Sequence, residues 1–196
     1  GKILQLGGCV GWTNKTLTTL RNSGNITILG GSTGASENAT TSNDKIANIG
    51  GNVGWVDVRL TMSDMENSGD ISISNYEAKY TFSVGGNIGR YNISVGGSGT
   101  NLKNSGTITL DETTKSGGGL YVGGCVAIHQ GNSGALTNCE NDAPITAKTA
   151  VPGGNVYIGG VVGYVDGGTD RTLTNTKNGK MLIALTSTGS GKTYAI

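Results

Sequence analysis

The segment Tyr157-Ile158-Gly159-Gly160-Val161-Val162-Gly163-Tyr164 is the fifth of five similar segments, and this repetition decides the fold. In each copy a pair of glycines follows a β-branched or aliphatic residue. The five copies of this anchor are Leu6-Gly7-Gly8, Ile49-Gly50-Gly51, Val84-Gly85-Gly86, Val122-Gly123-Gly124 and Ile158-Gly159-Gly160. Self-similarity of this kind is typical of repeat proteins, whose units stack on their neighbours along one axis.

An asparagine recurs behind each glycine pair, and an aliphatic residue follows the asparagine four positions later. The first interval between the asparagines is 45 residues, and each of the next three is 37 residues. Three equal intervals are very unlikely by chance, so the repeat has a defined length. The asparagines are Asn22, Asn67, Asn104, Asn141 and Asn178, and the aliphatic residues are Ile26, Ile71, Ile108, Ile145 and Leu182.

Each repeat reads as three short strands. In the fifth copy these are residues 157–164, the region around Leu173 that ends at Asn178, and residues 181–184. The alternation has the period of two that strands require: Ile26 and Ile28 point to one side and Thr27 to the other. No segment has a helical apolar period of useful length, so we expect almost no helix.

Stacked copies can bury apolar side chains that a single turn cannot, since equivalent residues then lie about 4.8 Å apart. We therefore predict an all-β fold, a right-handed parallel β-helix (β-solenoid) of about five three-stranded rungs. The single domain, 1–196, is divided into rungs near 1–45, 46–79, 80–118, 119–154 and 155–193. The expected core columns are Leu6, Ile49, Val84, Val122, Ile158; Val10, Val53, Ile88, Val126, Val162; and the aliphatic residues that follow the asparagines.

The repeated asparagines are expected to form a structural ladder at a bend, where side-chain amides hydrogen-bond from rung to rung. Asparagine tolerates left-handed backbone, as does the glycine two residues further on (Gly24, Gly69 and Gly106). We therefore expect an architectural role for these residues at the bend.

The composition excludes several classes of protein. Among the 196 residues are 36 glycines without the three-residue period of collagen. Charged residues make up 14% and the formal net charge is +1, which argues against disorder and against a nucleic-acid partner. No apolar run approaches about 18 residues, so we expect no membrane insertion.

The segments around the glycine pairs resemble the GLUG repeat. The resemblance rests on Gly8-Cys9-Val10-Gly11, Gly51-Asn52-Val53-Gly54, Gly86-Asn87-Ile88-Gly89, Gly124-Cys125-Val126-Ala127 and Gly160-Val161-Val162-Gly163, and on a Leu-x-Asn-x-x-Asn pattern such as 173–178. This chain departs from the motif by having Cys, Asn or Val after the second glycine in place of Leu. GLUG repeats occur in large bacterial surface proteins, including adhesins and non-catalytic parts of secreted peptidases, so the resemblance implies a surface role.

The stretch 186–193, TSTGSGKT, resembles a phosphate-binding P-loop. A P-loop needs Gly-x-x-x-x-Gly-Lys-[Ser/Thr] followed by a helix. Thr186 stands where the first glycine belongs, and three residues after Thr193 leave no room for the helix. We expect no nucleotide, and no other cofactor.

The cysteines and the single histidine suggest no reactive centre. Cys9 and Cys125 lie three rungs apart, roughly 14 Å, which is too far for a disulfide. Cys139 occupies an apolar column and is expected to be buried; a bridge to Cys125 on the same rung stays open. No Cys-x-x-Cys pair indicates a metal site. His129 is expected at the surface.

Two further columns carry the remaining candidate chemistry. Asn14, Asp57, Asn92, Gln130 and Asp166 hold two carboxylates three rungs apart, too far for the paired acids of a glycan-cleaving enzyme. The other column is Trp12, Trp55, Arg90, Ile128 and Tyr164. Facing outward, Trp12, Trp55, Arg90 and Tyr164 would form a ligand strip for sugar or protein. Their parity with Val10 and Val53 instead favours inward or corner packing.

The sequence thus predicts no catalytic residue and no enzymatic activity. We expect a non-catalytic structural or adhesive module of a secreted or cell-surface protein, as part of a stalk or filament and located outside the cell or on its surface. The alternative is a carbohydrate-binding or carbohydrate-active β-helix similar to polysaccharide lyases and hydrolases. The first and last residues read as strands, so the expected partners are further rungs of the same protein or head-to-tail copies, with a host or cell-surface glycan or protein as ligand.

Overall fold

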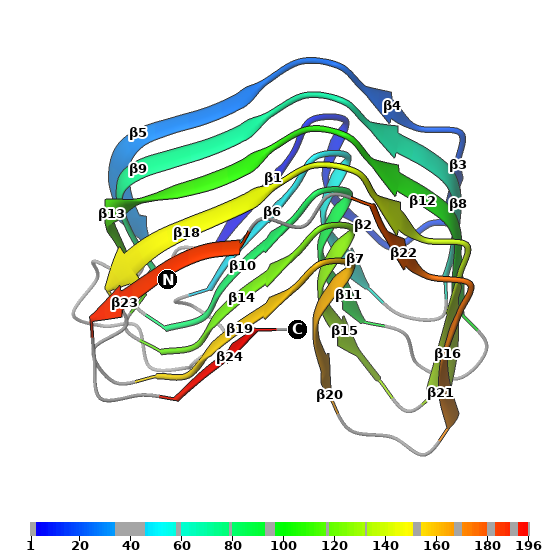
Figure 1. Ribbon diagram of the computed structural model, residues 1–196. Helices are drawn as coiled ribbons and strands as arrows, with labels where there is room; N and C mark the ends of the chain where they lie inside the picture. The colour runs from blue at the N-terminus through cyan, green and yellow to red at the C-terminus, as the bar shows by residue number, and fades with distance from the viewer. Residues whose placement is uncertain are drawn as a thin grey trace.

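The computed structural model of the chain describes residues 3–33, 46–57, 60–78, 80–92, 97–116, 118–131, 133–150, 154–166, 170–179, 183–188 and 192–195. All regular structure in this part of the chain is β-strand, and every pairing between neighbouring strands is parallel. The strands form four sheets that run the length of the stack (Figure 1). The expected all-β parallel architecture is confirmed.

The chain visits the four sheets in the same order in each coil, and we name them A to D in that order. Sheet A contains β1 (Leu4–Gly7), β6 (Ala47–Gly50), β10 (Phe82–Gly85), β14 (Leu120–Gly123), β19 (Val156–Gly159) and β24 (Thr193–Ala195). Sheet B contains β2 (Val10–Thr13), β7 (Val53–Asp57), β11 (Ile88–Asn92), β15 (Val126–Gln130) and β20 (Val162–Asp166).

Sheets C and D complete each coil. Sheet C contains β3 (Leu17–Thr18), β4 (Arg21–Asn22), β8 (Thr61–Asn67), β12 (Ser98–Asn104), β16 (Ser133–Thr137), β17 (Glu140–Asn141), β21 (Asp170–Thr174) and β22 (Lys177–Asn178). Sheet D contains β5 (Ile26–Thr33), β9 (Ile71–Ala78), β13 (Ile108–Ser116), β18 (Ile145–Ala150) and β23 (Ile183–Thr188).

The expected first strand of each repeat is wrong, because the glycine pair divides it into two. In the fifth copy, residues 157–164 fall partly in β19 and partly in β20, which belong to different sheets. The coil therefore has four faces where three strands were predicted. Figure 1 shows the result: sheets A and B form the inner arms of a V, and sheets D and C form its outer arms.

The predicted columns agree with the strand register. Leu6, Ile49, Val84, Val122 and Ile158 are successive partners in sheet A, as are Val10, Val53, Ile88, Val126 and Val162 in sheet B. In sheet D, Ile26, Ile71, Ile108 and Ile145 pair in turn, but the partner of Ile145 is Ile183. Leu182, the predicted fifth member, lies outside the described residues, and the register moves its place to Ile183.

Each arm of the V encloses its own hydrophobic core. The first core lies between sheets A and D and includes Ile49, Val84, Ile71, Ile108 and Phe82. The second lies between sheets B and C and includes Val53, Tyr91, Met62, Leu102 and Cys139. The residues named here are at most 1% exposed. The chain therefore buries two separate apolar strips in each coil.

The waist between the two cores is formed by the second glycine of each pair and the repeated asparagine. A Cβ atom on Gly86 would lie 2.4 Å from Cγ of Asn104 and 1.9 Å from the carbonyl oxygen of Gly124. Only glycine leaves room for the asparagine side chain on the facing sheet. The two repeated anchors of the sequence are thus in contact across the waist.

The repeated asparagines form a continuous ladder of side-chain amides. Nδ2 of each asparagine donates to Oδ1 of the next, at 2.8 Å for the first three steps and 3.2 Å for the last. The same Nδ2 also donates to a backbone carbonyl two residues further on, as from Asn104 to Gly106 at 2.8 Å. Because Asn67, Asn104 and Asn141 are buried, these bonds satisfy groups that water cannot reach.

The left-handed backbone near the ladder lies before the asparagines and not at the glycines that follow them. Gly24, Gly69 and Gly106 are not left-handed; their role is close stacking, since a Cβ on Gly106 would lie 2.0 Å from the carbonyl oxygen of Gly69. The left-handed residues of sheet C other than glycine come three positions before the ladder asparagines, with φ between 51° and 58°: Thr19, Asp64, Asn101, Asn138 and Asn175. Four of these form a second, exposed ladder, in which Asn101, Asn138 and Asn175 each donate to the preceding member.

In the described part of the chain, no helix is long and apolar enough to span a membrane.

Candidate functional site

The outer faces of sheets A and B face each other inside the V (Figure 1), and we call the region between them the A/B cleft. Side chains fill much of this region, since Asn48, Ser83 and Ile128 are buried. On sheet A the outward column alternates with core residues and consists of Gln5, Asn48, Ser83, Tyr121, Tyr157 and Tyr194. On sheet B the outward column consists of Trp12, Trp55, Arg90, Ile128 and Tyr164. The two walls lie very close at the bottom of the cleft: a Cβ atom on Gly89 would be 2.6 Å from the backbone nitrogen of Ile49.

The inward packing that strand parity favoured for Trp12 and Trp55 is wrong. Val53 and Val56 both belong to the second core, so two residues separate consecutive inward positions of β7. The ladder skips Gly54: Val53 pairs with Ile88 and Trp55 with Arg90, without a pairing between Gly54 and Gly89. This irregularity turns the tryptophan column outward. Trp12 is 44% exposed, whereas Trp55 is partly buried.

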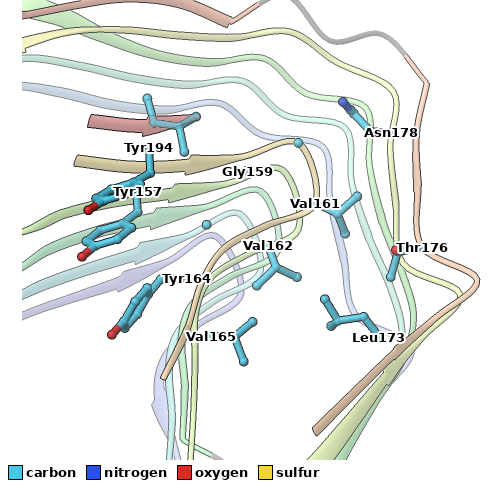
Figure 2. Close-up of a pocket in the computed structure, with 13 residues that line it drawn as sticks. Tyr157, Gly159, Val161, Val162, Tyr164, Val165, Leu173, Thr176, Asn178 and Tyr194 are labelled. Carbon is cyan, nitrogen blue, oxygen red and sulfur yellow. The ribbon is translucent and has the colours of Figure 1, made fainter. Parts of the chain in front are cut away.

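Tyrosine rings fill the C-terminal half of the cleft. The rings of Tyr121 and Tyr157 stack with centroids 5.2 Å apart, and those of Tyr157 and Tyr194 stack at 5.0 Å. Tyr164, from the opposite wall, meets Tyr157 at 4.7 Å and Tyr121 at 5.2 Å. Figure 2 shows Tyr157, Tyr164 and Tyr194 together, on the other side of the chain from Val161 and Val162. Sheet A and sheet B are therefore joined across the cleft by aromatic contacts.

Arg90 lies in the middle of the sheet B wall. Its guanidinium carbon is 5.4 Å from the centre of the Trp55 ring, and Nε and Nη2 donate to Oε1 of Gln130 at 3.0 and 2.5 Å. Burial lowers the pKa of Arg90, while the charges of Asp166 and Asp57 act in the opposite direction. Because the pKa of an arginine lies far above neutral, the guanidinium stays charged at neutral pH.

A polar column follows two residues after the tryptophan column on the same face of sheet B. It consists of Asn14, Asp57, Asn92, Gln130 and Asp166, and all five are amides or carboxylates. Nδ2 of Asn92 donates to Oδ1 of Asp57 at 3.2 Å. A small hollow of about 90 Å³ lies against this column and is lined by Arg90, Gln130, Asp166, Tyr121, Tyr164, Thr81 and Ile128.

The two carboxylates of this column do not form a pair. Asp57 and Asp166 are on strands three steps apart, which corresponds to roughly 14 Å. Groups of three or more His, Cys, Asp or Glu side chains that could hold a metal ion are absent from the described residues. The cleft therefore presents hydrogen-bonding groups and aromatic surface.

His129 is not at the surface as predicted. It is fully buried, and its ring lies 6.1 Å from that of Tyr91, its strand partner on β11. The hydroxyl oxygen of Tyr91 in turn lies 2.7 and 2.6 Å from the carbonyl oxygens of Leu60 and Ser98, which share its single proton. His129 therefore belongs to the interior of the second arm.

All three cysteines are free, with Cys9 exposed and Cys125 and Cys139 buried. Sγ of Cys125 donates to the carbonyl oxygen of Glu140 at 3.1 Å. Burial raises the pKa of the Cys139 thiol to about 11 and also raises that of Cys125. These two thiols are protonated at neutral pH and pack as small apolar side chains.

The P-loop-like stretch runs from the end of β23 to the start of β24. Thr186 and Thr188 belong to β23 and Thr193 to β24, whereas residues 189–191 lie outside the described residues. The strands on both sides follow the same A-to-D order as in the other coils. The stretch thus occupies the position of a connection between sheets D and A.

A larger hollow, of about 600 Å³, lies at the end of the stack and includes Val161, Val162 and Leu173 in its lining (Figure 2). In the preceding coil the equivalents of Val162 and Leu173, Val126 and Leu136, are fully buried in the second core. This hollow is therefore the end of the second core that no further coil covers among the described residues. The A/B cleft remains the better candidate site, because aromatic and polar groups lie together there.

The tyrosines of sheet A were missed as candidate residues. Tyr121, Tyr157 and Tyr194 occupy one position in three successive repeats, between two core residues. That regular spacing was visible in the sequence. What could not be foreseen is that sheet A turns at the glycine pair to face sheet B, because both were expected to form one strand.

No family model matches the chain, and neither curated proteins nor solved structures provide a match.

Proposed function

We propose that this chain is a non-catalytic structural or adhesive module of a secreted or cell-surface protein. In this proposal it is a right-handed parallel β-helix of about five coils, similar to the GLUG repeats of bacterial surface proteins, and it works outside the cell. Its coils serve as part of a stalk or filament that continues into further coils of the same protein or into head-to-tail copies.

The observation that supports this role most directly is the unbroken set of bonds along the stack. The ladder from Asn22 to Asn178 crosses all five coils, and the parallel backbone pairings accompany it in every sheet. Each coil binds mainly to the coils before and after it, so the stability of the stack is shared between neighbouring units. Such a structure resists extension and holds a surface at a fixed distance.

Mechanical stretching of single molecules tests the structural role. Held at its two ends, the folded chain should resist extension and then lengthen in steps that correspond to one or more repeats of 37 residues. Smooth extension without a resisted step would contradict a mechanical function.

A parallel assay tests the absence of catalysis. The chain is incubated with a panel of polysaccharides, and new reducing ends or unsaturated products are measured. We expect no product, and product that increases with protein concentration would establish the carbohydrate-active alternative.

A second function, carbohydrate binding, is favoured by the exposed Trp12 ring and the half-exposed polar side chains at the rim of the A/B cleft. Aromatic side chains and planar polar side chains line the same wall, which is the combination that orients small polar ligands in protein clefts. This function is compatible with adhesion, since an adhesive module needs a ligand.

A further inference from the structure

We propose that the tyrosine rings in the C-terminal half of the A/B cleft form a site of oxidative cross-linking, at which Tyr157 and Tyr194 are joined as dityrosine. The oxidant is a one-electron oxidant of the peroxidase class that uses hydrogen peroxide. We call the four rings of Tyr121, Tyr157, Tyr164 and Tyr194 the tyrosine cluster. The inference assigns a covalent modification and does not depend on the function proposed above.

The strand register places the two reacting rings face to face. Tyr157 on β19 and Tyr194 on β24 are direct partners in the parallel ladder of sheet A. Their rings are stacked, with centroids 5.0 Å apart and an angle of 7° between the planes. Figure 2 shows both hydroxyl groups at the same edge of this stack. The ortho carbons, which flank the carbon that carries the hydroxyl, therefore lie next to each other at that edge.

Tyr194 combines this contact with exposure and freedom to turn. Its side chain is 42% exposed, and Tyr157 is partly exposed, so an oxidant reaches the pair without entering either core. Bond formation requires the two rings to tilt towards each other, and an exposed ring can turn about its side-chain torsions. Tyr121 stacks on Tyr157 from the preceding coil, but Tyr164 also packs against it at 5.2 Å and restricts its movement. Tyr194 is therefore the partner expected for Tyr157.

Tyr157 is the centre of the tyrosine cluster. Its ring contacts those of the three other members, with centroids 4.7 to 5.2 Å apart. Electrons pass readily between aromatic rings in contact, so a radical that forms on one member is shared with Tyr157. Because the second ring is already held beside the first, coupling is a reaction within one molecule and has the advantage of a high effective concentration.

The reaction removes one electron and one proton from each of the two phenols. The phenoxyl radicals carry part of their spin on the ortho carbons, and a carbon–carbon bond forms between one ortho carbon of each ring. Each of these carbons then loses its hydrogen as a proton, and each oxygen regains a proton, so both phenols are restored. In total the pair loses two electrons and two protons, which reduce one hydrogen peroxide to two water molecules as its O–O bond breaks.

The new bond ties the last described strand of sheet A to the strand beside it. Tyr157 and Tyr194 are one repeat of 37 residues apart, so the cross-link closes a loop of that length. Since the two residues are already partners in the ladder, the backbone pairing of β19 with β24 needs no change. A covalent link of this kind restricts the unfolded chain, as a disulfide does.

Oxidation of the dilute folded chain with a haem peroxidase and hydrogen peroxide tests the proposal. Dityrosine is measured by its fluorescence, and mass spectrometry of proteolytic peptides identifies the linked residues by the loss of two hydrogen atoms. We expect one main product, linked within a single chain between Tyr157 and Tyr194. Tyr157→Phe keeps the ring and its packing but has no hydroxyl to oxidise, so the total yield of dityrosine should fall by about tenfold or more.

Tyr80→Phe is the matched control, because Tyr80 is about as exposed as Tyr194 (48% and 42%) and is not a member of the tyrosine cluster. This variant should form the same product in nearly the same yield, and equal melting temperatures would show that both variants are folded. Denaturant should abolish the preference for this pair, since the preference depends on the folded register.

Four results would overturn the proposal: links mainly between chains, a preference for another pair of tyrosines, an undiminished yield in Tyr157→Phe, or the same preference in the unfolded chain. None of them bears on the resistance to stretching, so the structural role is judged separately.

Discussion

The two cores of each coil are built from different side chains and on different backbones. The first core, between sheets A and D, consists largely of Ile, Val and Leu in unbroken columns. The second, between sheets B and C, contains Met62, Met65, Cys125, Cys139 and Tyr91. Sheet C contains a left-handed residue in each coil, such as Asp64 or Asn101. The inward positions of sheet D pair in simple alternation as far as Leu110, and the left-handed residues and register shifts of that sheet come only after this regular part.

The difference shows how backbone regularity determines which side chains a core accepts. Where strands alternate regularly, one aliphatic residue can stack on another, and branched side chains fill the column. Where a left-handed residue shifts the following side chain, the space is irregular, and flexible or small side chains fill it better. Methionine, with its unbranched and polarizable side chain, is suited to such spaces.

Replacing a central side chain of the first core should have the largest effect. Ile108 is fully buried in the middle of its column, so Ile108→Asp places a charge without a partner among aliphatic neighbours. We expect a loss of about 4 kcal/mol or more in the free energy of unfolding, measured by chemical denaturation. Thr109→Asp, one residue along on the half-exposed outer face, is the control and should cost less than about 1 kcal/mol. Equal losses would contradict the assigned orientation of sheet D.

A methyl group at the waist should separate the two cores. In Gly86→Ala the new Cβ would collide with the backbone of Gly124 and with the side chain of Asn104. We expect a loss of about 3 kcal/mol, because both obstacles are held by their own hydrogen bonds. Gly24→Ala is the matched control: its Cβ would be no closer than 3.6 Å to Asn22, an ordinary contact. A variant of Gly86 as stable as that of Gly24 would mean that the waist is not tightly packed.

Thiol reactivity tests how well the second core is closed in the folded protein. At neutral pH the exposed Cys9 should react with a thiol reagent in the folded protein, while Cys125 and Cys139 react after unfolding. Because burial raises the pKa of Cys139 to about 11, its protonated form stabilises the fold below the pKa of the unfolded thiol. That contribution decreases as the pH rises through the folded value. Rapid reaction of all three thiols in the folded protein would show that the second core opens readily.

Much of the register was predictable from the sequence because the glycine pairs and asparagines mark each repeat. Columns such as Leu6 to Ile158 followed from alignment of the repeats alone. The third column failed at its last member because Ile183, five residues after Asn178, takes the place expected four residues after it. An alignment based on spacing cannot detect such a one-residue shift when two neighbouring residues, here Leu182 and Ile183, are both aliphatic.

The candidate site was less predictable, for reasons that lie in the backbone. Trp12 and Trp55 were assigned by counting alternation from Val10 and Val53, and the irregularity at Gly54 changes the count. His129 was placed by its polarity, although it shares a column with the buried Val56 and Tyr91. That column faces the second core, which also contains residues of sheet C. The spacing of the repeats carries no information about contacts between sheets that are distant along the coil.

The two asparagine ladders have opposite polarity. Along the buried ladder, protons point from Asn22 towards Asn178, whereas along the exposed ladder they point from Asn175 towards Asp64. The amide dipoles of the two rows therefore oppose each other and partly cancel along the stack. The exposed row can end in Asp64 because a carboxylate accepts a hydrogen bond and has none to donate. An internal member of either row must both donate and accept a hydrogen bond. An amide side chain can do both, whereas an ionised carboxylate can only accept.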